Sequence, residues 1–216
     1  TETTTDHYKF RGPEEYISFR QNYYRSQGLS QPDYYWNRPD NLPDGVSAEE
    51  WRSLNENPLS DNQEEWMSRM NFFPLEREQY LAGETFDWAD FIYPRGFKQD
   101  ANLSISGGSE DVQYFWSIGR VDNEGVRLGD EFEAIRTRLN VDFQVTDWLS
   151  AGVNAEYSDR DESTIPAGDP HLMSPFSRLY DDEGNVEWRP HGYNVYNPAL
   201  NTLNAERKRK INNLFA

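Results

Sequence analysis

Residues 135 to 157 alternate strictly between two kinds of side chain, and this pattern most constrains how the chain folds. One face of the first run carries Ile135, Thr137, Leu139, Val141, Phe143 and Val145, and the other carries Arg136, Arg138, Asn140, Asp142 and Gln144. In the second run Leu149, Ala151, Val153, Ala155 and Tyr157 alternate with Ser150, Gly152, Asn154, Glu156 and Ser158. A period of two is typical of a β-strand. The polar break at 146–148 between the runs therefore predicts an antiparallel hairpin.

The length of these runs suggests an environment for the hairpin. Each run has about ten residues, whereas strands of globular proteins average about five or six. About nine to eleven tilted residues cross a bilayer in a barrel, with the apolar face toward lipid and the polar face toward a wet lumen. The residues then expected to face the lumen are Arg136, Arg138, Asn140, Asp142, Asn154 and Glu156. A soluble β-sandwich also has strands with one polar face, so the hairpin alone leaves both alternatives open.

A second hairpin is predicted upstream, where apolar and polar residues alternate on both sides of a turn at 107–111. The four expected strands cover 98–107, 112–121, 132–145 and 148–159. The connections within each hairpin are short, and the segments before and after the four strands are very long. Short turns at one end and long loops at the other are typical of outer-membrane barrels.

Composition excludes several classes of protein. The 216-residue chain has a formal net charge of −17, which disfavours binding to nucleic acid because phosphates would be repelled. It contains no cysteine, which excludes a disulfide scaffold and a thiolate metal site. No apolar run is long enough for a membrane-spanning helix, but alternating strands need no such run. Residues 1–6 lack the features of a signal peptide, so we expect a mature chain or an internal piece.

Residues 1–97 are expected to form a long, partly helical loop region. Helices are predicted from Pro13 to Gly28, over 48–55 and over 62–71, from proline and capping residues at their starts. Between them, Tyr34, Tyr35 and Trp36 lie in a rigid turn bounded by prolines. These three residues are candidate contacts for a ligand or partner, although a small local core that holds the loop together explains them more simply.

Residues 160–209 form a second long loop in this interpretation, and 210–216 start a further strand. Short strands are expected at 186–188 and 195–196 in this loop, and Trp188 and Tyr193 are further candidate contacts for a ligand or partner. The basic run 207–210 stands where the further strand would enter the membrane. It is a candidate contact for lipopolysaccharide phosphates, or simply a solvated rim.

Catalytic constellations in the sequence are weak. His7, His171 and His191 lie far apart, and none occurs in a zinc-binding arrangement. Acidic pairs are common in a chain of this charge and indicate nothing by themselves. We therefore expect no enzymatic activity, no cofactor and no bound metal.

Several separate motifs together resemble one family. They are Gly83–Ile92, Gln99–Gly108, Tyr114, Gly125, Leu139–Asn140, Asp147–Leu149, Tyr180–Asn185 and Asn197–Pro198, preceded by Pro13–Tyr16. This set resembles the early barrel strands and loops of SusC/RagA-type TonB-dependent transporters. The resemblance covers about residues 13 to 216.

The resemblance implies an all-β, antiparallel transmembrane β-barrel segment with long, partly helical extracellular loops, part of a barrel of about 22 strands. It implies a location in the outer membrane of a Gram-negative bacterium and contact with its lipid and lipopolysaccharide. It also implies import of oligosaccharides or peptides together with a SusD-like surface lipoprotein.

Energy would come from the TonB complex through a plug domain that is not in this sequence. The chain has no TonB box, no plug and only four expected strands, so we interpret it as a fragment of a larger transporter.

Two other classes remain as alternatives. A soluble secreted glycan-binding β-domain would explain the aromatic residues and the acidic composition. A secreted hydrolase is the weaker alternative, because no catalytic site is visible. A requirement for detergent separates the transporter from both.

Overall fold

The computed structural model describes residues 2–4, 10–27, 30–191 and 195–215. It divides the chain into two compact units. Residues 1–8, 89–169 and 198–216 form the first, here called the sheet unit. Residues 9–88 and 170–197 form the second, here called the helical unit.

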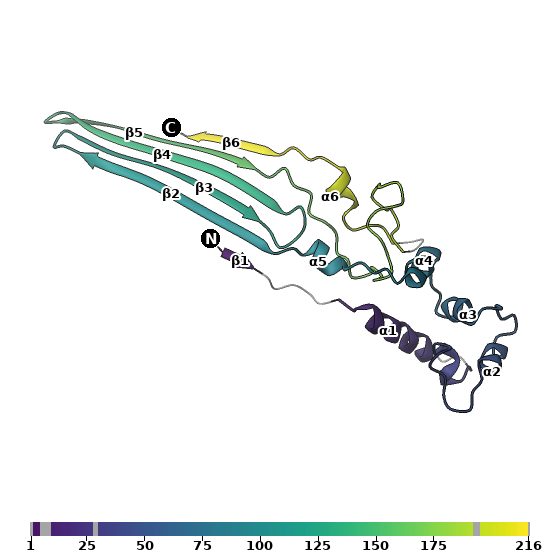
Figure 1. Ribbon diagram of the computed structural model, residues 1–216. Coiled ribbons are helices and arrows are strands. Elements are labelled where there is room, and N and C mark those ends of the chain that lie inside the picture. Colours follow the sequence, from purple (N-terminus) through teal and green to yellow (C-terminus); the bar gives the residue numbers. More distant parts are fainter. Residues whose placement is uncertain (1, 5–9, 28–29, 192–194, 216) are drawn as a thin grey trace. The chain divides into compact units, whose positions relative to one another are not determined.

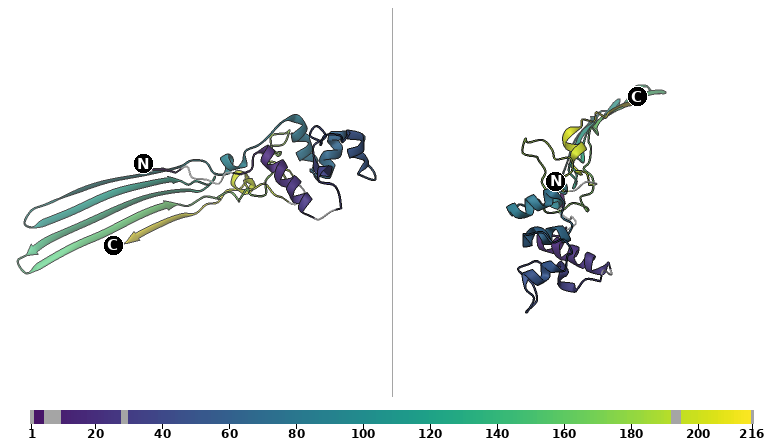
Figure 2. Two further views of the ribbon diagram at one scale, coloured as in Figure 1. Left: turned by 90° about the horizontal axis from the view of Figure 1, so that it is seen from below. Right: turned by 90° about the vertical axis from the view of Figure 1, so that its right-hand side faces the viewer.

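The sheet unit contains one antiparallel sheet in which the strands follow each other in chain order (Figure 1). The strands are β1 (Glu2–Thr4), β2 (Gly96–Gly108), β3 (Val112–Glu124), β4 (Glu131–Thr146), β5 (Leu149–Asp161) and β6 (Lys210–Phe215). The right-hand view of Figure 2 shows that these strands form a single thin, curved layer. The antiparallel sheet predicted from the alternation is thus confirmed, and its four expected strands are longer by one to three residues. Closure into a barrel stays a prediction.

The strand register follows the alternation of side chains. Leu139 of β4 lies opposite Trp116 of β3 on one side and Ala155 of β5 on the other. Val141 lies between Tyr114 and Val153 in the same way. Because side chains alternate strictly along a strand, this register collects the apolar residues of neighbouring strands on one face.

The turn between β2 and β3 is held by local hydrogen bonds. The Ser109 N–H donates to the carbonyl oxygen of Val112 over 2.7 Å, and the Ser109 hydroxyl accepts from the N–H groups of Asp111 and Val112. Beside this turn the ring of Tyr114 covers Gly107, where an added Cβ would lie 2.7 Å from the tyrosine oxygen. The glycine therefore lets an aromatic ring lie flat across the strand pair, which favours this register.

The other end of the sheet is tied to irregular segments. The connection from β3 to β4 carries Gly129 with φ +75°, close to the backbone of Ile165. The Leu128 N–H donates to the carbonyl of Ile92, at the end of helix α5 (Trp88–Ile92), and the Ala167 N–H donates to the carbonyl of Leu128. Helix α6 (Leu200–Asn204) precedes β6. In the described part of the chain, no helix has both the length and the apolar character to cross a membrane.

The helical unit contains α1 (Pro13–Ser26), η1 (Asp33–Trp36), α2 (Ala48–Ser53), α3 (Asn62–Arg69) and α4 (Pro74–Ala82). The predicted starts of α1, α2 and α3 are confirmed. Ser47 caps α2 by accepting from Glu50 N–H, and Asp61 caps α3 by accepting from two N–H groups. Gly28, the expected end of α1, lies outside the described residues. Helix α4 was not expected, although Pro74 at its start and Gly83 with φ +72° at its end are common boundaries.

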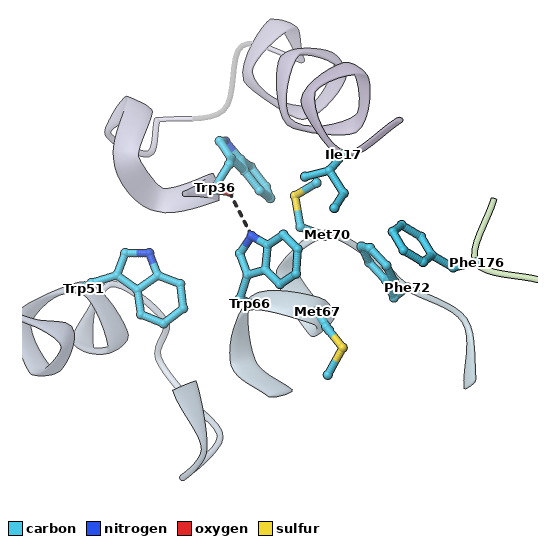
Figure 3. Close-up of a cluster of buried hydrophobic side chains, with 8 residues drawn as sticks. All are labelled: Ile17, Trp36, Trp51, Trp66, Met67, Met70, Phe72 and Phe176. Atoms are coloured by element: carbon cyan, nitrogen blue, oxygen red, sulfur yellow. Dashed lines mark hydrogen bonds between the residues drawn. The ribbon is translucent and has the colours of Figure 1, made fainter. Parts of the chain in front are cut away.

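Large buried side chains form the core of the helical unit (Figure 3). They are Ile17, Trp36, Trp51, Trp66, Met67, Met70, Phe72 and Phe176. The indole N–H of Trp66 donates to the backbone carbonyl of Trp36 over 3.2 Å, so the buried polar atom is satisfied.

Phe176 comes from the second long loop, so this core also includes a residue from beyond the four long strands. The Phe86 N–H donates to the carbonyl of Pro175, and the Trp88 indole N–H donates to the Ser177 hydroxyl over 2.6 Å. Parts of 1–97 and 160–209, expected as separate loops, thus share one core. The strands expected at 186–188 and 195–196 were wrong: Val186 forms only an isolated bridge with Tyr180.

A buried ion pair lies beside this core. Arg69 Nε donates to a Glu65 oxygen over 2.6 Å, and both side chains are about 1% exposed. The Arg69 guanidinium lies between the rings of Tyr35, at 4.1 Å, and Trp51, at 3.9 Å. Glu65 also accepts from the Asn55 amide and the Leu59 N–H. Burial raises the pKa of Glu65, but these hydrogen bonds and Arg69 outweigh it and hold the pKa below its ordinary value.

We expect Arg69→Met to destabilise the helical unit by about 3–5 kcal/mol, because Glu65 would stay buried without its cation. Hydrogen exchange of the α2 and α3 amides in the intact protein measures this. Glu14→Gln is the control, because it removes only a surface ion pair between Arg38 and Glu14. The Glu14 side chain is 77% exposed, so this substitution should lower the stability by less than about 1 kcal/mol. Unchanged protection in Arg69→Met would contradict the role given to the pair.

Candidate functional site

The polar face of the sheet carries all six residues that the sequence placed together. Arg138 lies opposite Ser117 and Glu156, and Asn140 lies opposite Phe115 and Asn154. In the neighbouring rows, Arg136 lies opposite Gly119 and Ser158, and Asp142 lies opposite Gln113 and Gly152. The register therefore brings the six residues onto one face of β4 and β5. That this face lines a lumen stays a prediction.

Glycines on this face leave room for polar neighbours. An added Cβ at Gly119 would meet the Asn102 side-chain oxygen, and one at Gly152 would lie 2.5 Å from an Asp142 oxygen. The side chains of Asn102 and Asp142 therefore extend across the neighbouring strand. Two grooves of about 490 and 390 Å³ result, one beside Asn140 and Asp142 and one beside Arg136, Arg138 and Glu156. The polar face is thus grooved, and water or a second protein surface could occupy the grooves.

The charges of the polar face are not neutralised within the sheet. In the described part of the chain, Arg136, Arg138, Asp142 and Glu156 make no ion pair within 4.0 Å. Charged residues near the long-loop end of the sheet behave differently: Arg120 pairs with Glu133 over 2.9 Å, and Lys210 pairs with Asp161 over 3.1 Å. The polar face thus presents both signs of charge to whatever lies against it.

The opposite face of the sheet is apolar and exposed. Leu103 is 57% exposed, Ile105 is 50% exposed and Val153 is 48% exposed. Other large apolar residues on this face that are at least one-third exposed are Val112, Tyr114, Ile118, Ile135, Leu139, Phe143, Val145, Leu149, Tyr157 and Leu214. Soluble monomers rarely expose continuous apolar patches larger than a few hundred Å². This face therefore needs an apolar environment.

Polar or aromatic residues limit the apolar face at both ends. Toward the long loops, Arg120 and Asp159 lie opposite Ile135 on its two sides, and the next row on this face carries Asp122, Glu133 and Asp161. At the other end Trp148 stands in the turn between β4 and β5 and is 83% exposed. An apolar band with charges at one border and an indole at the other fits a surface that meets lipid and its interface.

The aromatic residues of the helical unit lie in different settings. Trp36 is 6% exposed in the core and Tyr35 contacts Arg69, while Tyr34 packs against the core. These positions agree with the local core that explained the three residues most simply. By contrast, Trp188 is 55% exposed and its ring centre lies 5.8 Å from that of Tyr196. Tyr193 lies outside the described residues.

The two described histidines, His171 and His191, belong to no group of side chains that could hold a metal ion. His191 is 5% exposed, and burial lowers its pKa although the nearby Glu76 carboxylate acts in the opposite direction. His171 lies at a cavity beside α1, and His7 is outside the described residues. Within the part of the chain that the structure describes, no group of three or more His, Cys, Asp or Glu side chains could hold a metal ion.

Comparison with known proteins relates the chain to TonB-dependent receptors. No family model matches it. TonB-dependent receptor P26 of Formosa agariphila is 27% identical over 137 residues, which is 60% of this chain and 14% of the receptor. Receptors P39 and P3 of the same organism are 33% and 32% identical over 66 and 78 residues, 6% and 8% of their lengths. The chain thus spans a small part of the relatives it matches. The similarity supports the TonB-dependent receptor family and no particular type within it.

The two faces of β4 should respond differently to charge. We expect Val141→Arg to reduce the amount of folded protein in the outer membrane strongly, because Arg on a lipid face at mid-membrane costs about 2–4 kcal/mol. Asn140→Arg, the neighbouring residue on the polar face, is the matched control and should assemble normally. Heat-modifiability on gels of isolated outer membranes reports folding. Equal loss in both variants would contradict the assignment of faces.

Proposed function

We propose that this chain is a wall segment with its loops in a TonB-dependent outer-membrane transporter that imports nutrients, either oligosaccharides or peptides. The observation that carries the proposal is the single-layer sheet with one exposed apolar face and one charged, furrowed face. A soluble glycan-binding domain would have to cover the apolar face, and the described residues leave it exposed. The similarity to TonB-dependent receptors supports the same conclusion.

The strand dimensions support a membrane wall. Strand β3 has 13 residues. Such a strand is about 43 Å long at about 3.3 Å per residue. With a tilt of about 40° it would rise about 33 Å, against a hydrocarbon core of about 30 Å. The apolar run from Ile135 to Val145 on β4 has the length of about 9–11 residues that crossing requires.

The direction of the strands follows from the connections. The turns at 109–111 and 147–148 are short, whereas more than forty residues separate β5 from β6. In outer-membrane barrels the short turns are periplasmic and the long loops extracellular. The helical unit is therefore proposed to lie outside the cell. The basic residues 207–210 then stand at the outer leaflet, near lipopolysaccharide, although Arg209 and Lys210 already pair with Glu162 and Asp161.

The charged face would contact a plug. A transporter must stay closed until energy from TonB moves the plug, and polar wet contacts release more readily than a dry apolar seal. Arg136 and Arg138 on β4 have no ion-pair partner among the described residues, so they are available for such contacts. In this scheme the chain supplies binding surface and support and performs no chemical reaction.

The variant Arg136→Ala/Arg138→Ala should assemble like the parent but leak, because the wall would lose two cations that hold the plug. Conductance of the intact transporter in planar bilayers measures this. We expect more frequent and longer openings than in the parent. Arg120→Ala is the control, since Arg120 stands on the other face and pairs with Glu133. A double variant that is as tightly closed as the parent would contradict the role of these arginines.

The helical unit is proposed to form part of a docking surface for a SusD-like surface lipoprotein. Long loops without a function are usually disordered, whereas this unit has a tryptophan-rich core and a buried ion pair. An ordered extracellular unit of this size is suited to present a constant surface to a partner.

Purification of the intact protein in mild detergent should therefore recover a second, lipid-anchored protein. Mass spectrometry of the purified complex identifies it and its acylation. We expect Arg69→Met, which weakens the helical unit, to reduce the recovered partner while Asn140→Arg does not. Recovery of the transporter alone, with the helical unit cleaved readily by protease, would contradict the proposal.

A further inference from the structure

A cavity of about 300 Å³ in the helical unit differs from the rest of the chain in its charge. It lies between helix α1 and residues 171–173, and its lining includes Arg11, Tyr16, Phe19, Arg20, Tyr23 and His171. Among the described residues that line it there is no aspartate or glutamate, although the chain contains 38 of these residues and has a net charge of −17. In such an acidic protein, a cavity whose described lining contains arginine and no carboxylate is suited to an anion.

Three carboxylates of helix α1 or in contact with it are already engaged. Glu14 pairs with Arg38 over 2.9 Å, and Glu15 accepts from the Gly12 N–H. Glu76 is fully buried, where Arg20 donates to both of its oxygens over 3.0 Å and the Tyr16 hydroxyl donates over 2.8 Å. The charge of Arg20 is therefore balanced by Glu76.

Arg11 remains as the uncompensated cation of the cavity. Its guanidinium carbon lies 4.1 Å from the centre of the Phe19 ring, which holds the planar group against an aromatic face. Among the described residues it has no ion-pair partner within 4.0 Å. A planar, supported guanidinium is suited to bind a carboxylate through two hydrogen bonds.

Exposed aromatic rings stand beside this cation. Phe19 is 45% exposed and Tyr23 is 51% exposed, and both belong to the exposed side of α1. Such rings can bury the apolar face of a sugar ring. The volume is near the lower limit of about 300–1,000 Å³ for small-molecule sites, which is enough for one ring of a longer ligand.

We propose that this cavity binds an acidic oligosaccharide, with a uronate carboxylate on Arg11 and the sugar ring against Phe19 and Tyr23. The inference rests on the proposed function, because it assigns a substrate class to the same transporter. A peptide is less favoured: the cavity borders a helix and a loop, where no strand edge offers backbone hydrogen bonds.

The test is calorimetric titration of the intact protein in detergent. The probes are tetramers of galacturonate, mannuronate and glucuronate, each compared with its own methyl ester, which keeps the sugar and removes the charge. We expect at least one acidic tetramer to bind at least tenfold more tightly than its ester. Arg11→Gln should reduce that affinity to the level of the ester, and Arg11→Lys should retain part of it.

Two controls make the result specific. Arg95→Gln removes an exposed arginine that does not line the cavity and should leave binding unchanged. Phe19→Ala should weaken both the acid and the ester, because it removes the stacking surface. Fractionation of the same proteins tests outer-membrane location separately, so that failure of the transporter proposal is distinguishable from failure of this site.

Equal binding of acid and ester, or an Arg11→Gln variant with parental affinity, would overturn the proposal. So would an absence of binding by all three acids. Tighter binding of a tetraglutamate peptide than of any uronate tetramer would overturn it in favour of a protein segment.

Discussion

The register between β3, β4 and β5 is the constraint on which the sheet depends. A slip of one residue would move Leu139 and Val141 to the face that carries Arg138 and Asn140, and would mix the two faces. In the observed register one face is apolar over most of its length and the other is mainly polar and charged, so they need two different environments. Lipid suits one face, and water or a polar protein surface suits the other. The chain is similar to TonB-dependent receptors over a small part of their length, and a sheet with two such faces is consistent with that similarity.

A different interaction orders the helical unit. Buried indoles and the pair between Arg69 and Glu65 hold short helices whose own length would not stabilise them. The cation between Tyr35 and Trp51 ties the aromatic turn to α2 and α3. Because Phe176 completes this core, two segments that are distant in sequence are ordered together. A docking surface or a ligand site benefits from such an ordered unit. A mobile loop would have to become ordered on binding, and the entropy cost of that ordering would lower its affinity.

Much of this structure could be predicted from local patterns. Strict alternation predicted β2 to β5, because successive side chains of a strand point to opposite faces and the same alternation sets the register. Capping residues such as Ser47 and Asp61 predicted where helices begin. The common core of the two long segments could not be predicted, because single aromatic residues such as Phe176 carry no sign of their distant partners. The cavity beside α1 was missed for the same reason: Arg11 and Phe19 look like ordinary surface residues until the neighbouring carboxylates are seen to be engaged elsewhere. Alternation also predicted which residues share each face of the sheet, but it could not show what lies against either face.

The central claim is that the apolar face of the sheet meets lipid, and spin labelling along β4 tests it most directly. The chain contains no cysteine, so single cysteines at consecutive positions from 135 to 145 could be labelled cleanly within it. Collision with oxygen, which concentrates in lipid, and with a water-soluble nickel complex would then be compared for the intact protein in bilayers. If this face meets lipid, we expect high oxygen accessibility at Leu139, Val141 and Phe143, and low oxygen accessibility at Arg138, Asn140 and Asp142. Uniform accessibility to the nickel complex along the strand, without alternation, would contradict a lipid-facing sheet.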